Sequence, residues 1–364
     1  MRLKISSSPH FHSKNSTSSI MWNVSLALAP AAIWGVYVFG LRALLILVVS
    51  IAASVVTEYL LGLIDGERGL KQSTLSDGSA FLTGLLVGMN MSPLVPVLIP
   101  IIASAFAIGI VKWIFGGLGQ NWMNPALGGR VFVFFSFTSL MSNYQMPKTL
   151  PALTGASVDA IGSATPLSYV KTSITNGLLN QSPSAIMTNG GYPTTDFAQN
   201  LAQTLHISPY AVDAFFGNIG GCIGEVSAFL LLVGGIYLCV KKIISWHIPV
   251  TFIGFFALLT WMFSGYRSGF GFASGEVLGQ VFSGGLFLGA IFMATDMVTS
   301  PITKKGQVIF GLGCGFWTFL FRYFGSLPEA VSLAIILMNI LTPTIDRYVV
   351  PKKFGYIKPV KEAN

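Results

Sequence analysis

Long apolar runs separated by short polar stretches make up most of this chain. Five runs come before residue 142 and five come after residue 214. They are residues 20–40, 43–64, 78–91, 94–115, 125–141, 220–240, 246–266, 277–295, 308–324 and 328–345. A helix of about 20 residues crosses the hydrocarbon core of a bilayer, so the shortest runs are marginal for a full crossing. The pattern predicts an all-α polytopic membrane protein with about ten transmembrane helices.

The two groups of apolar runs resemble each other in sequence. Gly78–Asn90 is similar to Gly284–Asp296, and each segment is soon followed by Ser-Pro. Each then leads to a run with a cation before an aromatic residue, Lys112 in the first group and Arg322 in the second. With five helices per group the second copy would be inverted, which places broken helices and functional sites near the repeat interface. Chance similarity between helices rich in Gly and Leu is the alternative.

The charges predict the orientation of these helices. Only 9% of the residues are charged, whereas soluble domains carry roughly 25%. The net charge of +8 does not indicate a nucleic-acid partner, because the lysines lie at the ends of apolar runs. If the N-terminus is cytoplasmic, only five of the 21 cations fall outside, namely Arg42, Lys148, Lys171, Arg267 and Arg322. This asymmetry predicts that both termini are cytoplasmic.

These patterns divide the chain into five parts. Residues 1–19 form a cytoplasmic N-terminal segment, and residues 20–141 form the first five-helix repeat. Residues 142–214 are the one long polar interval and form an extracytoplasmic loop. Residues 215–346 form the second five-helix repeat, and residues 347–364 form a cytoplasmic tail.

One hydroxyl in the polar interval is surrounded by small residues. Thr165 follows Ser163 and Ala164, and Asp159 lies six residues before it. This stretch resembles the D-x-x-[S/T]-G-A-T motif on which a flavin transferase esterifies the phosphate of FMN to a threonine. Gly162 stands where the motif has Ser or Thr, and Ser163 stands where it has Gly. A loop rich in Ser, Thr and Gly without chemistry is the alternative.

Three further stretches carry the same resemblance. Asn124–Phe132 is similar to N-P-A-x-x-x-R-x-F, Gly220–Ser227 to G-G-x-I-G-E-x-S, and Phe292–Pro301 to M-A-T-D-x-V-T-S-P. Together they extend the resemblance from residue 20 to 355. The chain thus resembles the NqrB/RnfD family, the membrane subunits of Rnf complexes and of Na+-translocating NADH:quinone oxidoreductases. The short N-terminus is more similar to the RnfD branch.

The resemblance implies a function. It implies the D subunit of an Rnf-type complex, with covalent FMN on Thr165, that relays electrons in ferredoxin:NAD oxidoreduction coupled to Na+ or H+ translocation. The implied location is the bacterial cytoplasmic (inner) membrane, with the flavin loop outside. The implied partners are a flavin transferase and other Rnf subunits, among them membrane subunits with an iron–sulfur cluster and a second subunit with covalent FMN. The chain is not expected to be active alone.

Five charged side chains within or beside the apolar runs are further candidates. Glu58, Asp77, Glu225 and Asp296 form a candidate ion route, since charges in hydrocarbon are costly and usually functional. Helix capping is the alternative, above all for Asp77. Arg130 is a candidate contact for a second, non-covalent flavin such as riboflavin, or else an anchor at the membrane interface.

Several chemistries are not predicted for this chain. The cysteines at 222, 239 and 314 are far apart in sequence, so the chain offers no spacing for a zinc site or an iron–sulfur cluster. No G-x-G-x-x-G follows a strand, so a partner must handle NADH. No catalytic residue is predicted. Three other functions stay open: an NqrB-like subunit that delivers electrons to quinone, an inverted-repeat solute channel or transporter without redox chemistry, and a structural scaffold.

Overall fold

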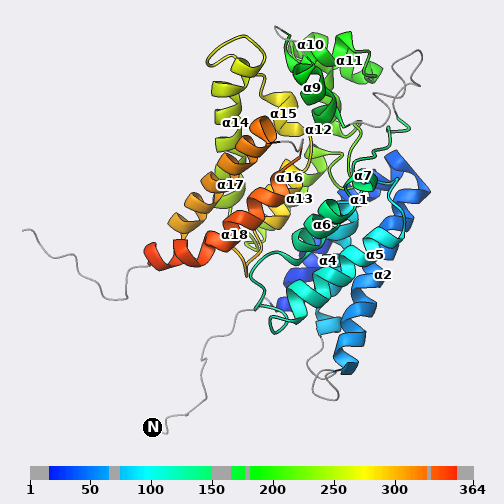
Figure 1. The fold of residues 1–364 in the computed structure, drawn as a ribbon, viewed down its shortest axis with the longest axis vertical. Helices are drawn as coiled ribbons and strands as arrows, with labels where there is room; N and C mark the ends of the chain where they lie inside the picture. Colours follow the sequence, from blue (N-terminus) through cyan, green and yellow to red (C-terminus); the bar gives the residue numbers. More distant parts are fainter. Residues whose placement is uncertain (1–15, 65–73, 150–164, 177–180, 326–328, 351–364) are drawn as a thin grey trace, which may run out of the picture.

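The computed structural model describes residues 16–64, 74–149, 165–176, 181–325 and 329–350. All regular secondary structure in these ranges is helical (Figure 1). The prediction of an all-α protein is therefore confirmed. Asp159, Ser163 and Ala164 of the threonine motif lie outside the described residues.

The first half contains two long helices followed by shorter ones. The helices are α1 (Thr17–Phe39), α2 (Leu41–Ile64), the 3-10 turn η1 (Thr74–Asp77), α4 (Ser79–Met89), α5 (Leu98–Phe106), α6 (Pro125–Ser136) and α7 (Thr138–Met141). The end of α5 continues as a π-helical segment, η2 (Ala107–Trp113).

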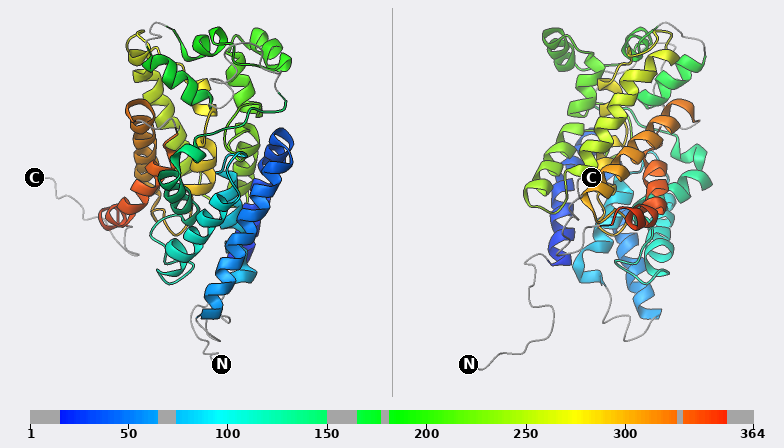
Figure 2. Two further views of the ribbon diagram at one scale, coloured as in Figure 1. Left: turned by 45° about the vertical axis from the view of Figure 1, so that its right-hand side comes forward. Right: turned by 90° about the vertical axis from the view of Figure 1, so that its left-hand side faces the viewer.

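The second half has a similar order of helices, except that its π-helical segment follows the third helix instead of the fourth. Its helices are α13 (Ala228–Val240), α14 (His247–Arg267), α15 (Leu278–Phe282), α16 (Leu286–Leu288), the π-helical segment η3 (Gly289–Met293), α17 (Lys304–Phe324) and α18 (Val331–Tyr348). Between the halves lie α9 (Pro166–Thr175), α10 (Pro183–Asn189), α11 (Asp196–Leu205) and α12 (Pro209–Phe216). These four gather at one end of the molecule, and the C-terminal end of α2 lies at the opposite end (Figure 2).

Not every predicted run is an uninterrupted helix. Among the described residues, three helices are long and apolar enough to cross a membrane by length and composition, Thr17–Phe39, Leu41–Ile64 and His247–Tyr266. The run 277–295 divides into α15, α16 and η3. Its break includes Gly284, whose φ of 70° lies in the left-handed region that glycine tolerates, and Gly78 before α4 has a φ of 80°. A broken helix is thus confirmed within the run 277–295, whereas in the first half Gly78 precedes the single helix α4.

The two halves pack on each other through corresponding helices. The first helices, α1 and α13, are in contact, and so are the last ones, α6 and α18. Glycines allow this approach: a Cβ at Gly234 on α13 would overlap the Ala27 carbonyl of α1, and one at Gly35 would overlap the Ile223 carbonyl. One hydrophobic core includes residues of both halves. Pairing of equivalent helices is what a two-fold related pair of repeats requires.

Candidate functional site

A buried cluster of charged and polar side chains joins the two halves. Arg130 on α6 donates from Nη1 to Asn90 Oδ1 (2.7 Å), Glu225 Oε1 (3.1 Å) and Ser332 Oγ (3.0 Å). Its Nη2 donates to Glu329 Oε2 (3.4 Å). Asn90 and Arg130 belong to the first half, whereas Glu225, Glu329 and Ser332 belong to the second. We call these five residues the interface cluster.

Local sequence explains how α6 presents Arg130. Asn124 caps α6, because its side chain accepts a hydrogen bond from the backbone N–H of Ala126. Pro125 occupies the first helical position, where its missing N–H costs nothing. Gly129 packs so closely on α5 that a Cβ there would overlap the Ala103 carbonyl. The short helix α6 is therefore fixed at its start and along one side, which directs Arg130 inward.

The interface cluster contains two carboxyl groups but only one guanidinium. All three side chains are at most 10% exposed. Glu225 Oε2 has no hydrogen-bond partner among the described residues. Cys222, Glu225 and Glu329 also place one potential ligand atom each within 4.8 Å of one another. The adjacent guanidinium of Arg130 makes this trio a poor cation site, because it already neutralises part of the negative charge.

The structure revises both interpretations of Arg130 and adds two residues to the candidate site. Arg130 is 8% exposed, so the alternative of an interfacial anchor is wrong. Its hydrogen-bond partners are protein groups, and neither described cavity includes Arg130 in its lining. Sequence reasoning missed Glu329 and Ser332. Glu329 follows Leu-Pro at the edge of an apolar run, and this position gave no sign that its side chain reaches the interior.

Glu58 forms a separate ion pair inside the first half. Lys112 Nζ on η2 lies 2.8 Å from both carboxylate oxygens of Glu58 and 2.7 Å from Ser79 Oγ. The side chains of Glu58 and Lys112 are 8% and 4% exposed. A buried pair of opposite charges with a further hydrogen bond is electrically balanced. The pair joins α2, η2 and the start of α4, so its geometry fits a structural role better than an ion route.

Asp77 and Asp296 differ in what surrounds them. Asp77 accepts a hydrogen bond from the Ser79 backbone N–H (2.8 Å) at the start of α4, as the capping interpretation expects, although the N-cap position itself is Gly78. Asp296 accepts from the Val298 N–H (3.4 Å) and the Thr299 hydroxyl (3.2 Å). It also borders a cavity, so its carboxylate is available to a ligand as well as to the turn after η3.

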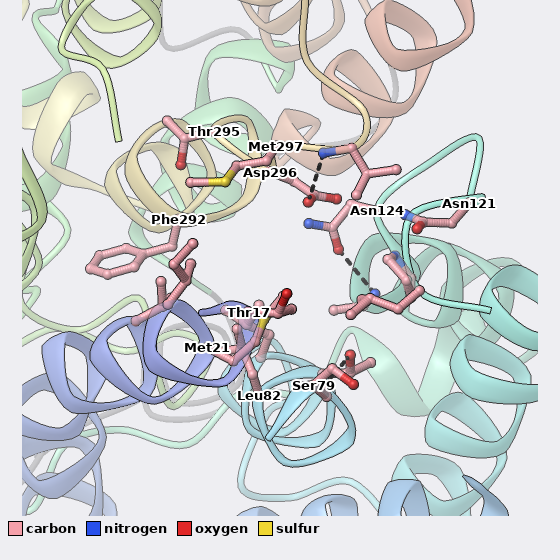
Figure 3. Close-up of a pocket in the computed structure, with 18 of the residues that line it drawn as sticks. Thr17, Met21, Ser79, Leu82, Asn121, Asn124, Phe292, Thr295, Asp296 and Met297 are labelled. Atoms are coloured by element: carbon pink, nitrogen blue, oxygen red, sulfur yellow. Dashed lines mark hydrogen bonds between the residues drawn. The ribbon is translucent and has the colours of Figure 1, made fainter. Parts of the chain in front are cut away.

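This cavity lies between the two halves and has a volume of about 360 Å³ (Figure 3). Its walls come from α1, α4, the segments around η2 and α6, the end of α13 and the η3 region. Most of the lining is apolar, with residues such as Met21, Leu82 and Phe292. Asn121, Asn124 and Asp296 supply polar groups that lie close together on one side of the cavity, as Figure 3 shows. An apolar cavity with a few convergent polar groups is typical of a small-molecule site.

Thr165 occupies the N-cap of α9. Its Oγ1 accepts a hydrogen bond from the Ser168 backbone N–H (3.2 Å), and Pro166 begins the helix. Thr165 is only 1% exposed, whereas esterification by a second enzyme requires a hydroxyl that this enzyme can reach. The cause of this burial is the packing of α9, since Leu167 and Val170 are also buried. The polar sequence around Thr165 concealed this apolar face of the helix.

Comparison with known proteins identifies the family. The sequence profile of the NQR2, RnfD, RnfE family matches residues 4–355. The chain belongs to this family. It is 43% identical over 351 residues to the D subunit of the proton-translocating ferredoxin:NAD(+) oxidoreductase complex of Clostridium ljungdahlii, and the match covers 96% of both chains. The resemblance seen in the sequence is thus confirmed.

Two other relatives are similar over nearly their whole length. The D subunit of the Na(+)-translocating ferredoxin:NAD(+) oxidoreductase complex of Acetobacterium woodii is 39% identical over 370 residues, which cover 100% of this chain and 98% of the relative. The D subunit of an ion-translocating oxidoreductase complex of Stutzerimonas stutzeri is 36% identical over 94% of this chain and 93% of the relative. Relatives at similar identity are named for different ions, so similarity to them does not identify an ion for this chain.

Proposed function

We propose that this chain is the membrane-embedded D subunit of an Rnf-type complex, which relays electrons in ferredoxin:NAD oxidoreduction coupled to ion translocation. The observation that carries the proposal is the end-to-end similarity to relatives named as the D subunits of such complexes. The test is purification of the tagged chain from native membranes. Recovery with partner subunits and ferredoxin-dependent NAD reduction is expected, whereas quinone reduction by the recovered complex would favour the NqrB-like alternative.

The redox group in this proposal is FMN, esterified through its phosphate to Thr165 Oγ1. The position of Thr165 suits a phosphate, because the free N–H groups and the positive end of the dipole at a helix N-terminus favour anions. The flavin would supply the electron-transfer chemistry, and α9 would hold it at the end of the molecule formed by α9–α12. Because Thr165 is buried, the transferase must modify it before α9 docks or while α9 is displaced.

The proposed complex lies in the bacterial cytoplasmic membrane, with the flavin outside and both chain termini inside. Electrons pass between this flavin and the redox groups of neighbouring subunits, which include iron–sulfur and flavin carriers. A partner handles NADH. In this proposal, the chain positions one electron carrier, the FMN on Thr165, and contributes the buried charges of the interface cluster.

A second, non-covalent flavin would fit the cavity between the halves better than the surroundings of Arg130. The volume of about 360 Å³ falls within the range of small-molecule sites, and the apolar walls suit an aromatic ring system. The side chains of Asn121 and Asn124 could donate to ring carbonyl oxygens. Arg130 instead directs its nitrogens to Asn90, Glu225 and Glu329.

Asp296→Asn is expected to lower ion uptake at least tenfold in proteoliposomes that contain the whole complex. The substitution removes the charge that attracts a cation, while Asn can still accept the hydrogen bonds from the turn after η3. Asp77→Asn is the matched control, because Asn caps a helix about as well as Asp. FMN on Thr165, measured by intact mass, is expected to be unchanged in both variants. Normal ion uptake by Asp296→Asn would exclude Asp296 from the ion route.

A further inference from the structure

Arg322 on α17 is a buried cation that forms no salt bridge with the described residues. Its side chain is 4% exposed, and Nη1 donates to the Gln280 carbonyl (2.6 Å). The guanidinium carbon lies 4.9 Å from the centre of the Phe256 ring. Nε and Nη2 have no hydrogen-bond partner within the ranges that the structure describes, and no carboxylate there forms an ion pair with Arg322. A buried guanidinium with unpaired N–H groups destabilises the fold, and a bound anion would offset this cost.

Lys112 is the equivalent cation in the first half, and its partners show which interaction Arg322 lacks. Lys112 and Arg322 lie in the fourth helix of their halves, and each side chain ends beside the start of the third helix, Lys112 at Ser79 and Arg322 at Gly284. Lys112 bonds to Ser79 beside Gly78 and has Glu58 of α2 as its counter-ion. Arg322 Nη2 would lie 3.4 Å from a Cβ built on Gly284.

The second half has no carboxylate in the place of Glu58. Helix α14 is the counterpart of α2, and its sequence contains no Asp or Glu. Glu329 also lies beside Gly284, but it forms its ion pair with Arg130. The second half therefore keeps the cation of the repeat, but no carboxylate on α14 forms a salt bridge with it as Glu58 does with Lys112.

Helix α9, which Thr165 caps, covers this cation. Lys171 Nζ of α9 donates to the backbone carbonyls of Arg322 (3.0 Å) and Gly325 (2.6 Å). A Cβ on Gly284 would lie 3.0 Å from Leu167 Cδ1. Leu167 and Arg322 Nη2 therefore both lie next to Gly284. A cavity of about 30 Å³ lies between α9 and the ends of α14, α15 and α17, and Leu167, Lys171, Gln280 and Arg322 line it.

We propose that Arg322 binds the phosphodiester that links FMN to Thr165, an inference that rests on the proposed function. A phosphodiester carries one negative charge, which balances the single charge of Arg322. The two free N–H groups of a guanidinium match two phosphate oxygens in a bidentate contact. The N-terminus of α9 adds backbone donors on the other side of the phosphate. Arg322 and Lys171 are also two of the five cations that the charge pattern places outside. Binding of the phosphodiester by Arg322, on a helix that Lys171 holds in place, would explain why these two cations lie on that side.

The test compares the full-length chain purified from cells with and without the flavin transferase. Intact mass reports flavin attachment, and the thermal midpoint Tm reports the contact. In the wild type, flavin attachment is expected to raise Tm by about 4 °C. Arg322→Gln should remove at least half of this gain while raising the Tm of the unmodified chain, because the unpaired charge is gone. Arg322→Lys should keep part of the gain, since lysine retains the positive charge but cannot make the bidentate contact of a guanidinium. Lys171→Gln is the control, because it should lower the Tm of both forms equally.

The outcomes separate the two proposals. A wild-type chain that stays unmodified beside an active transferase overturns the proposed covalent flavin and this inference together. A modified chain whose gain in Tm survives Arg322→Gln overturns this inference alone. If the Arg322 variants do not fold, phosphorus-31 NMR of the modified wild type decides. A phosphodiester held against Arg322 should resist line broadening by a soluble paramagnetic chelate, whereas a signal broadened like that of free FMN would exclude the contact.

Discussion

Thr165→Ala is expected to remove all covalently bound flavin from the chain. Thr165 supplies the only hydroxyl at the position that the D-x-x-[S/T]-G-A-T resemblance selects, and alanine offers no oxygen for a phosphate ester. The wild type purified beside its transferase should gain the mass of FMN less one water and fluoresce in a denaturing gel. The variant should show neither signal, and ferredoxin-dependent NAD reduction by the complex should fall to background.

Two companion variants separate loss of flavin from loss of stability. Thr165 caps α9, and removal of a capping oxygen costs about 1 kcal/mol. Thr165→Asn keeps a capping oxygen but has no hydroxyl, so it should fold like the wild type and still lack flavin. Thr165→Ser keeps both and should be modified. Flavin that persists in Thr165→Asn would place the ester on another residue.

The same measurement distinguishes the classes of function that the sequence left open. A channel or transporter without redox chemistry predicts an unmodified wild-type chain and solute flux by the isolated protein. A scaffold predicts that Thr165→Ala has no effect on electron transfer. The redox interpretation alone predicts both the mass gain and its loss with Thr165.

The helices could be predicted from the sequence because apolar runs are local signals. Gly78 and Gly284 both adopt the left-handed backbone conformation, and the sequence similarity of these segments marks them as equivalent. The capping role of Asp77 could be predicted for the same reason, since its partner Ser79 is two residues away. The lengths of the helices are harder to predict from local rules. A segment that contains a break can be as apolar as a continuous helix, and composition alone does not show where the backbone turns.

The interface cluster could not be predicted as a unit. Arg130 lies 95 residues from Glu225 and 199 residues from Glu329 in sequence. Sequence showed that Glu225 and Arg130 were unusual in an apolar environment, but not that each is the other's partner. The burial of Thr165 was missed for a related reason. It depends on how α9 packs on the second half, through contacts such as Lys171 to Arg322 and Gly325.

Arg130→Gln is expected to destabilise the chain by about 3–5 kcal/mol, the usual cost of removing one partner from a buried ion pair. The substitution leaves Glu225 and Glu329 buried near each other without the guanidinium that both contact. Two carboxylates this deeply buried repel each other. In detergent, the variant should lose its monodisperse peak in size-exclusion chromatography at a clearly lower temperature than the wild type. Arg42→Gln is the control, because its guanidinium is exposed and bonds to a single carbonyl at 3.2 Å.

The double variant Arg130→Gln, Glu225→Gln tests whether charge is the cause. It removes one positive and one negative charge, so Glu329 is left as a single carboxyl group that can bind a proton. Much of the lost stability should return, and the effects of the two single changes should not add. If the double variant is as unstable as Arg130→Gln, the lost contacts to Asn90 and Ser332 account for the damage. A single Arg130→Gln variant with a wild-type melting temperature would mean that the apolar contacts between α1 and α13 and between α6 and α18 are enough to hold the two halves together.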